Sequence, residues 1–123
     1  MKMSERHIGS VTILDLDGTI TIDDGTERLK DKVNSLVLQQ RTSVVLNLAG
    51  IHYIDSGGLG QMVACYSSLA KTGGALKLLN VGKRNLSLLS MTRLLTVFAT
   101  FESEDDAVRS FPERDAPQPI SAG

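Results

Sequence analysis

The chain has 123 residues, with 13 Lys and Arg against 14 Asp and Glu, so its formal net charge is 13 − 14 = −1. The length fits one domain with its own core, and the near-zero charge argues against nucleic-acid binding or a polybasic membrane anchor. The apolar runs are far shorter than the ~20 residues that span a bilayer, and the single cysteine cannot form an intramolecular disulfide. We therefore expect a cytoplasmic protein with no nucleic-acid or membrane partner.

The first third of the chain predicts a strand pair followed by a helix. Residues 6–8 are expected to form a short edge strand, and the β-branched residues 11–16 a second strand that ends at a turn. Asp24 is predicted to cap the next helix, with Glu27 reaching back as in a capping box. The apolar residues of this helix then recur on one face: Leu29, Val33, Leu36 and Val37.

The remaining segments alternate between strands and helices. Residues 43–48 form a continuous apolar run, as in a strand covered on both faces. The helix after Ser56 presents Leu59, Met62, Val63, Tyr66 and Leu69 on one face and stops at Gly73-Gly74. Further elements are predicted as a strand at 75–81, a helix at 85–95 with Leu86 and Leu89 inward, a strand at 97–101 and a helix at 104–111.

This alternation predicts an α/β fold in a single domain over residues 4–111. We expect a mixed, mostly parallel sheet of about five strands, with an antiparallel first pair and about four helices mainly on one side. Residues 112–123 hold all three prolines and have no apolar periodicity. They are predicted to be a disordered C-terminal tail.

Residues 14–19, Leu-Asp-Leu-Asp-Gly-Thr, match the D-x-D-G-T signature of haloacid-dehalogenase-type phosphatases. That resemblance implies Asp15 as nucleophile, Asp17 as acid/base and a Mg²⁺ ion, with Ser56, Lys83 and the acids at 104–106 completing the site. The core of that family is longer than this chain, and extended chain continues after Gly18 instead of a helix. We therefore predict that both aspartates are structural and that the protein is not an enzyme.

The segment Asp55-Ser56-Gly57-Gly58-Leu59-Gly60 opens a helix directly after a buried strand. Ser56 lies at the N-cap or one position from it, where a phosphate on its oxygen would meet the positive end of the helix dipole. A phosphoserine would also add a charge of about −1.5 to −2 beside Asp55 and repel a bound partner. The spacing alone favours a plain serine cap on a core helix.

Over residues 8–110, the chain resembles the STAS-domain, anti-sigma factor antagonist family. The resemblance rests on Leu16-Asp17-Gly18, on the apolar run 44–48, on Tyr53-Ile54-Asp55-Ser56-Gly57-Gly58-Leu59-Gly60 and on Gly73-Gly74 with the strand after it. In that family the serine after the Asp is the phospho-acceptor, which implies Ser56. The next position is usually Ser or Thr, whereas here it is Gly57. An Asp near the first helix is also typical, and Asp23 or Asp24 could match it.

The resemblance implies a binding switch that has no metal or cofactor of its own. The unphosphorylated form would bind an anti-sigma factor serine kinase and free the sigma factor; phosphorylation of Ser56 would release the kinase, and a metal-dependent serine/threonine phosphatase would reset the switch. The expected contact surface comprises Asp23, Asp24, Asp55, Gly57, Gly58, Leu59, Gln61 and Met62. Two alternatives remain: a STAS module of a stressosome or lipid-transport complex without Ser56 phosphorylation, and a small Mg-dependent haloacid-dehalogenase-type phosphatase using Asp15 and Asp17.

Overall fold

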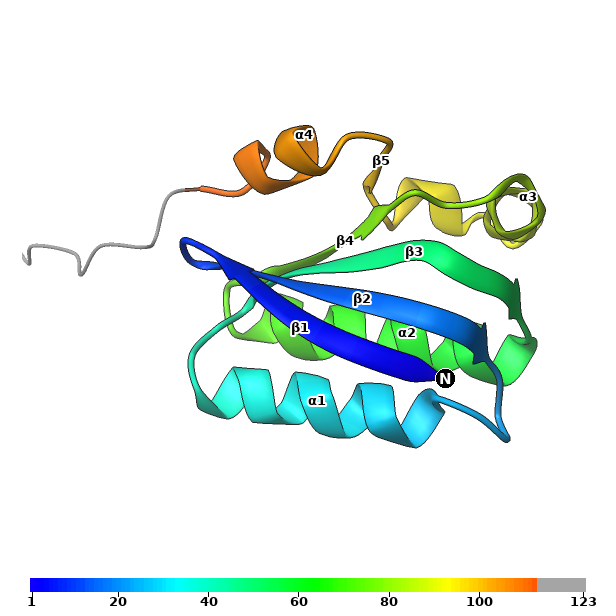
Figure 1. The fold of residues 1–123 in the computed structure, drawn as a ribbon, viewed down its shortest axis with the longest axis horizontal. Coiled ribbons are helices and arrows are strands. Elements are labelled where there is room, and N and C mark those ends of the chain that lie inside the picture. Colours follow the sequence, from blue (N-terminus) through cyan, green and yellow to red (C-terminus); the bar gives the residue numbers. More distant parts are fainter. Residues whose placement is uncertain (113–123) are drawn as a thin grey trace, which may run out of the picture.

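One sheet of five strands, in the order β1-β2-β3-β4-β5, organises the computed structural model, which describes residues 1–112 (Figure 1). β1 pairs antiparallel with β2, and the other neighbours are parallel. The elements are β1 (Lys2–Ile8), β2 (Val11–Ile20), α1 (Thr26–Leu38), β3 (Ser43–Ile54), α2 (Ser56–Lys71), β4 (Ala75–Leu79), α3 (Lys83–Met91), a 3₁₀ helix (Leu94–Thr96), β5 (Thr100–Phe101) and α4 (Glu104–Arg109). The predicted fold class and element order are therefore confirmed.

The sheet lies between two layers of helices of unequal size. Helices α1 and α2 run side by side under one face, and α4 lies over the opposite face (Figure 1). Successive side chains of a strand point to opposite faces, so β2 sends Leu14 and Leu16 into the core with α1 and α2. Ile13 and Val45 instead pack with Ala107 of α4. This explains why residues 43–48 form a continuous apolar run.

The structure corrects several predicted boundaries. β1 is longer than the predicted 6–8, and the last strand is only Thr100–Phe101. α3 begins at Lys83, two residues earlier than predicted. Its inward face is formed by Asn85 and Leu89, which are buried, whereas Leu86, predicted to point inward, is 38% exposed. The predicted domain limits, 4–111, stay a prediction. The predicted tail, 112–123, lies beyond the described residues from position 113 onward.

The predicted capping box at α1 is wrong. The N-cap is Gly25 in the left-handed conformation (φ 97°), and no side chain caps the helix. The Asp24 carboxylate turns instead to Thr19, whose Oγ1 donates to it over 3.0 Å, and to the Met1 ammonium at 2.6 Å. These partners lower the pKa of Asp24, the ammonium group more than the hydroxyl. Thr19 lies near the end of β2 and Met1 directly precedes β1, and the sequence pattern alone does not bring the Met1 ammonium to the Asp24 carboxylate.

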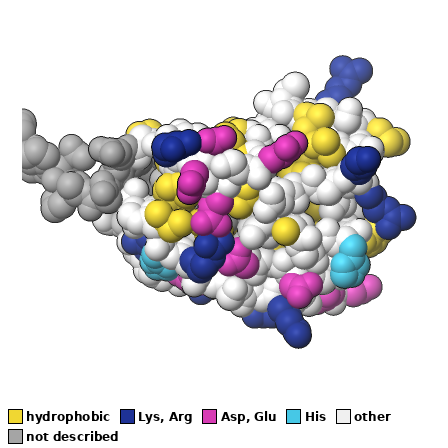
Figure 2. Space-filling view, turned by 45° about the horizontal axis from the view of Figure 1, so that its top comes forward, with side chains coloured by type: hydrophobic (Ala, Val, Ile, Leu, Met, Phe, Trp, Pro, Cys, Tyr) yellow, Lys and Arg dark blue, Asp and Glu magenta, His cyan; other side chains and the backbone are white. Residues whose placement is uncertain are grey.

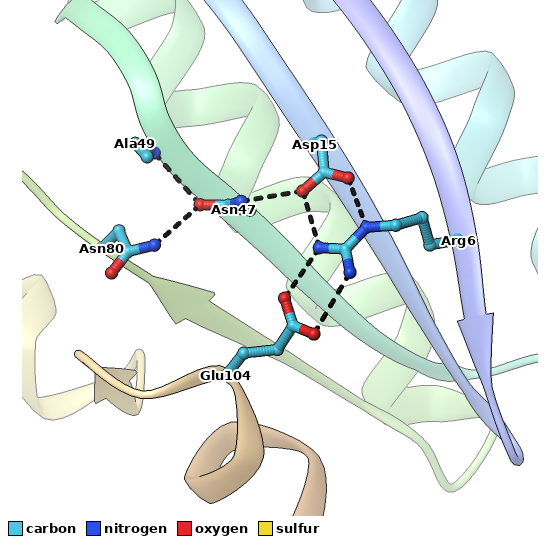
Figure 3. A network of polar contacts seen from close by, with 6 residues as sticks. All are labelled: Arg6, Asp15, Asn47, Ala49, Asn80 and Glu104. Atoms are coloured by element: carbon cyan, nitrogen blue, oxygen red, sulfur yellow. Dashed lines mark hydrogen bonds and ion pairs between the residues drawn. The ribbon is translucent and has the colours of Figure 1, made fainter.

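A polar network on the α4 side of the sheet connects α4 to three strands (Figure 3). The Arg6 guanidinium donates to both oxygens of Asp15, at 2.6 and 3.0 Å, and to both oxygens of Glu104, at 2.7 and 3.1 Å. Asn47 donates to Asp15 over 2.7 Å and accepts from Asn80 over 3.1 Å. The bonds from Arg6 are the main reason that the pKa values of Asp15 and Glu104 lie below their ordinary range.

We predict that Arg6→Gln lowers the free energy of unfolding by about 1 kcal/mol near neutral pH, because the ion pairs are partly exposed but form a network. The two carboxyl groups have lowered pKa values in the folded state. Their contribution is therefore present above their ordinary values, near pH 4, and is lost as the pH falls through the lowered values. Urea unfolding of both proteins at pH 7 and pH 2 measures this, and the two should converge at pH 2.

Arg109→Gln is the matched control, since Arg109 forms an exposed pair with Asp106 on the same helix α4. It should change stability by a few tenths of a kcal/mol at most. An Arg6→Gln effect that is equally large at both pH values would contradict the role given to the carboxylates.

Candidate functional site

Asp55 joins the start of α2 to the end of β2. Its Oδ1 accepts the Gly58 amide at 2.7 Å, which makes Asp55 the N-cap of α2, and its Oδ2 accepts the Ile22 amide at 3.2 Å. The Asp55 amide in turn donates to the Ile20 carbonyl at 3.2 Å. The carboxyl ends of two neighbouring parallel strands are thereby fixed to each other, with the β2–α1 loop beside the first turn of α2.

Ser56 is the first residue of α2, one position beyond the cap, and it is exposed. No hydrogen bond among residues 1–112 uses its hydroxyl, so Oγ is open to solvent and to an incoming reagent. The first amides of a helix have no partner within the helix, and one of them, that of Gly58, is already occupied by Asp55. The predicted role of Ser56 as a cap is therefore taken by Asp55, which leaves the hydroxyl free for modification.

Two glycines let the two loops approach closely. A Cβ on Gly58 would lie 1.9 Å from the Ile20 carbonyl oxygen, and a Cβ on Gly57 would lie 2.8 Å from the Cβ of Ile22. Gly57 thus leaves room for Ile22, a large hydrophobic residue that is 71% exposed beside Ser56. This contact gives a packing reason for glycine at the position after Ser56. Ile22 was not among the predicted contact residues.

The structure separates the predicted contact residues into exposed and buried ones. Asp23 is exposed, and Asp24, Asp55, Gly57 and Gln61 are partly buried. Gly58 is buried at the contact with β2. Leu59 and Met62 are 7% and 0% exposed and belong to the core between the sheet and α1, so the prediction that they form part of the contact surface is wrong. Helical periodicity alone predicts both residues to be in the core. Their assignment to the contact surface came only from the family resemblance.

A hollow of about 300 Å³ lies beside Ser56, between the end of β3 and helix α3. Its lining residues are Tyr53, Ile54, Asp55, Ser56, Arg84, Asn85, Ser87, Leu88 and Met91. The Arg84 guanidinium lies over the Tyr53 ring, 5.7 Å from the ring centre. Sequence analysis assigned neither residue to the site, because nothing local to 84 indicates that α3 packs next to β3.

The residues of the phosphatase-like motif do not assemble a catalytic site. Asp15, the nucleophile that the phosphatase resemblance would imply, has both oxygens engaged by Arg6 and Asn47, and Glu104 also pairs with Arg6 (Figure 3). Within residues 1–112, no three His, Cys, Asp or Glu side chains are grouped as metal ligands. The motif therefore lies within β2, which continues through Gly18 to Ile20 instead of ending at the predicted turn, and its first aspartate supports the packing of α4.

The family comparison identifies the class of protein. The STAS domain model matches residues 2–107, and the chain belongs to the STAS domain family, whose antagonist members are regulators and not enzymes. Among curated proteins, the chain is similar to the anti-sigma-B factor antagonist of Bacillus subtilis, at 35% identity over 66 residues. This alignment covers 54% of the chain and 60% of that relative, so the chain matches less than two thirds of the relative's length.

Solved structures share the fold. A candidate anti-sigma factor antagonist of Thermotoga maritima superposes with a TM-score of 0.82 at 21% identity, over 88% of this chain and 92% of that one. The Bacillus cell fate determinant SpoIIAA in its phosphorylated form superposes with a TM-score of 0.71 at 17% identity, over 89% and 98%. At these identities the likeness shows the fold alone. In residues 1–112, none of the helices has the length and apolar character needed to cross a membrane.

We predict that Gly58→Ala destabilises the protein by about 2 kcal/mol or more, because the new methyl group would overlap a backbone carbonyl that cannot move away. Gly60→Ala, two residues further along the same helix, has nothing within 4 Å of the new methyl group and should stabilise by about 1 kcal/mol. Thermal and urea unfolding of the two variants measure the difference. Equal effects of the two substitutions would show that β2 and α2 are less closely packed than the structure has them.

Proposed function

We propose that this STAS protein is an anti-sigma factor antagonist whose binding is controlled by phosphorylation of Ser56. The observation that carries the proposal is the exposed, unengaged hydroxyl of Ser56 at the first position of α2, directly after the capping Asp55. The similarity to the antagonist of Bacillus subtilis supports the choice among STAS functions. So does the fold shared with SpoIIAA, which exists in a phosphorylated form.

The contact surface would consist of the Ser56 loop and the adjacent β2–α1 loop. Asp55 holds these two loops together, so a partner meets a preformed surface that includes Ile22, Asp23, Gly57 and Gln61. Ile22 provides exposed apolar area at its centre. Preformed surfaces lose little conformational entropy on binding, which favours affinity.

Phosphorylation would act through local charge. A phosphate on Ser56 adds about −1.5 to −2 charge at pH 7, next to the carboxylates of Asp55 and the β2–α1 loop. The open amides at the start of α2 would stabilise this group in the free protein. In a complex, the same charge would be desolvated against the partner and would weaken binding.

The partner in this cycle would be an anti-sigma factor that is also a serine kinase. Its binding to the unphosphorylated protein would free the sigma factor, and transfer of the γ-phosphoryl group of ATP to Ser56 Oγ would release ADP and end the complex. A metal-dependent serine/threonine phosphatase would then hydrolyse the phosphoserine and restore binding. This protein, the anti-sigma factor kinase and the phosphatase would all operate in the cytoplasm.

We predict that Ser56→Ala binds the kinase partner as tightly as the unphosphorylated wild type and stays bound in the presence of ATP. Ser56→Asp should bind about tenfold more weakly or worse, because it places a permanent charge at the interface. Co-purification from the native cells with the Ala variant identifies the partner, and calorimetric titration then gives the affinities. Equal affinity of wild type, Ala and Asp forms, with no phosphate on Ser56, would refute the proposal.

We further predict different effects for the two aspartates of the β2–α1 loop. Asp23 is exposed, and Asp23→Asn should weaken partner binding several-fold while leaving the unfolding temperature unchanged. Asp24 holds Thr19 and the Met1 ammonium, so Asp24→Asn should lower the unfolding temperature as well. Asp105→Asn, an exposed acid on α4, is the matched control and should change neither quantity. Loss of stability in Asp23→Asn would contradict its assignment to the contact surface.

The alternative, a STAS module of a stressosome or lipid-transport complex without phosphorylation, is distinguished by the same co-purification. A transporter ATPase in place of a sigma-factor regulator, with the same partners for wild type and Ser56→Ala, would favour it.

A further inference from the structure

We propose that Arg84 of α3 is the residue that binds the phosphate of phosphorylated Ser56. The two residues lie 28 positions apart in sequence, but both line the hollow between β3 and α3. This inference rests on the proposed phosphorylation of Ser56 and adds the residue that stabilises the modified state. It also makes α3 a part of the switch, although α3 lies outside the predicted contact surface.

The setting of Arg84 suits a phosphate. Arg84 and Asp55 are the two charged residues among those that line the hollow, and both oxygens of Asp55 already accept backbone amides. No ion pair within residues 1–112 involves Arg84, whose guanidinium instead rests over the Tyr53 ring. A guanidinium presents paired N–H donors that match two phosphate oxygens, and it can keep its aromatic contact while it donates.

The sequence around α3 offers Arg84 no acidic neighbour. No Asp or Glu occurs between Asp55 and Glu102, so α3 and the segments that flank it carry only cations. In the space-filling view, hydrophobic side chains gather at the right-hand end of the molecule, next to several Lys and Arg side chains and also to an acidic one (Figure 2). An anion that forms on Ser56 would share the hollow with Arg84, the cation among its lining residues.

The backbone of α3 is held in place by a buried contact next to Arg84. Asn85 is 2% exposed, and its Nδ2 donates to the Ile51 carbonyl of β3 over 3.2 Å. β3 leads directly into Ser56, so this bond and the Asp55 cap fix α3 and the Ser56 loop to the same strand. Arg84, the neighbour of Asn85 in α3, and Ser56 are thereby held on the two sides of one hollow.

The pairing has a measurable consequence for the acidity of the phosphate. The second ionisation of phosphoserine has a pKa of about 6, and a nearby cation favours the dianion and so lowers that value. Because the pair is open to solvent, we expect the midpoint to be lower by about 0.5, less than a close buried cation would give. A phosphate that only contacts backbone amides would not respond to the identity of residue 84.

The test uses the full chain with phosphoserine installed at position 56 during translation, so that no kinase is needed. The ³¹P chemical shift is followed by NMR from pH 4 to pH 8 in the otherwise unchanged protein and in Arg84→Gln, Arg84→Lys and Arg93→Gln. Arg93 lies beyond the end of α3 and does not line the hollow, so Arg93→Gln is the matched control for loss of one positive charge. Circular dichroism establishes that each variant is folded.

We expect Arg84→Gln to raise the ³¹P midpoint by about 0.5, Arg84→Lys to restore part of the difference and Arg93→Gln to leave the midpoint unchanged. The Arg84 Nε–H signal should also shift between the unmodified and the phosphorylated chain. The inference would be overturned if the phosphorylated parent chain and its Arg84→Gln variant had the same ³¹P midpoint. It would also be overturned if Arg93→Gln raised the midpoint as much as Arg84→Gln does. If native cells carry no phosphate on Ser56 but the midpoints differ as expected, the proposed function fails and the inference about Arg84 stands.

Discussion

The geometry of the site depends on one carboxylate. Asp55 accepts an amide from the first turn of α2 with one oxygen and an amide from the β2–α1 loop with the other. The same residue therefore ends β3, begins α2 and fixes a loop that comes from 33 residues earlier in the chain. Because the cap is provided by Asp55, the hydroxyl of Ser56 is not needed for helix stability and remains available at the surface.

The position of the site follows from the parallel sheet. Carboxyl ends of neighbouring parallel strands meet at one edge, and the loops that leave them form a shared surface on a rigid scaffold. Here β2 and β3 stay paired to their last residues, where Ile20 lies opposite Ile54. The glycines after Ser56 then let α2 approach the β2 backbone at a distance that no side chain would allow. A charge placed on Ser56 acts on this whole surface at once.

The contacts on the α4 side of the sheet explain why a complete match to a phosphatase motif does not indicate a phosphatase. The D-x-D-G-T segment is present in full, but Arg6 and Asn47 engage both oxygens of its first aspartate and connect it to α4 (Figure 3). A short motif reports chemistry only when the surrounding structure places its residues in the required roles. In this protein the same residues stabilise the packing of a short helix that buries few apolar side chains.

The sequence by itself determined the α/β class, the order of the elements and the place of Ser56 at the start of α2. Each of these depends on local signals: apolar periodicity, glycine positions and the strand-to-helix turn. Only the tertiary structure decided that Asp24 bonds to Thr19 and to the Met1 ammonium instead of capping α1. It also brought Arg84 and Tyr53 to the same hollow as Ser56. The physical reason is contact between segments far apart in sequence: the Met1 ammonium reaches the β2–α1 loop, and α3 packs against β3.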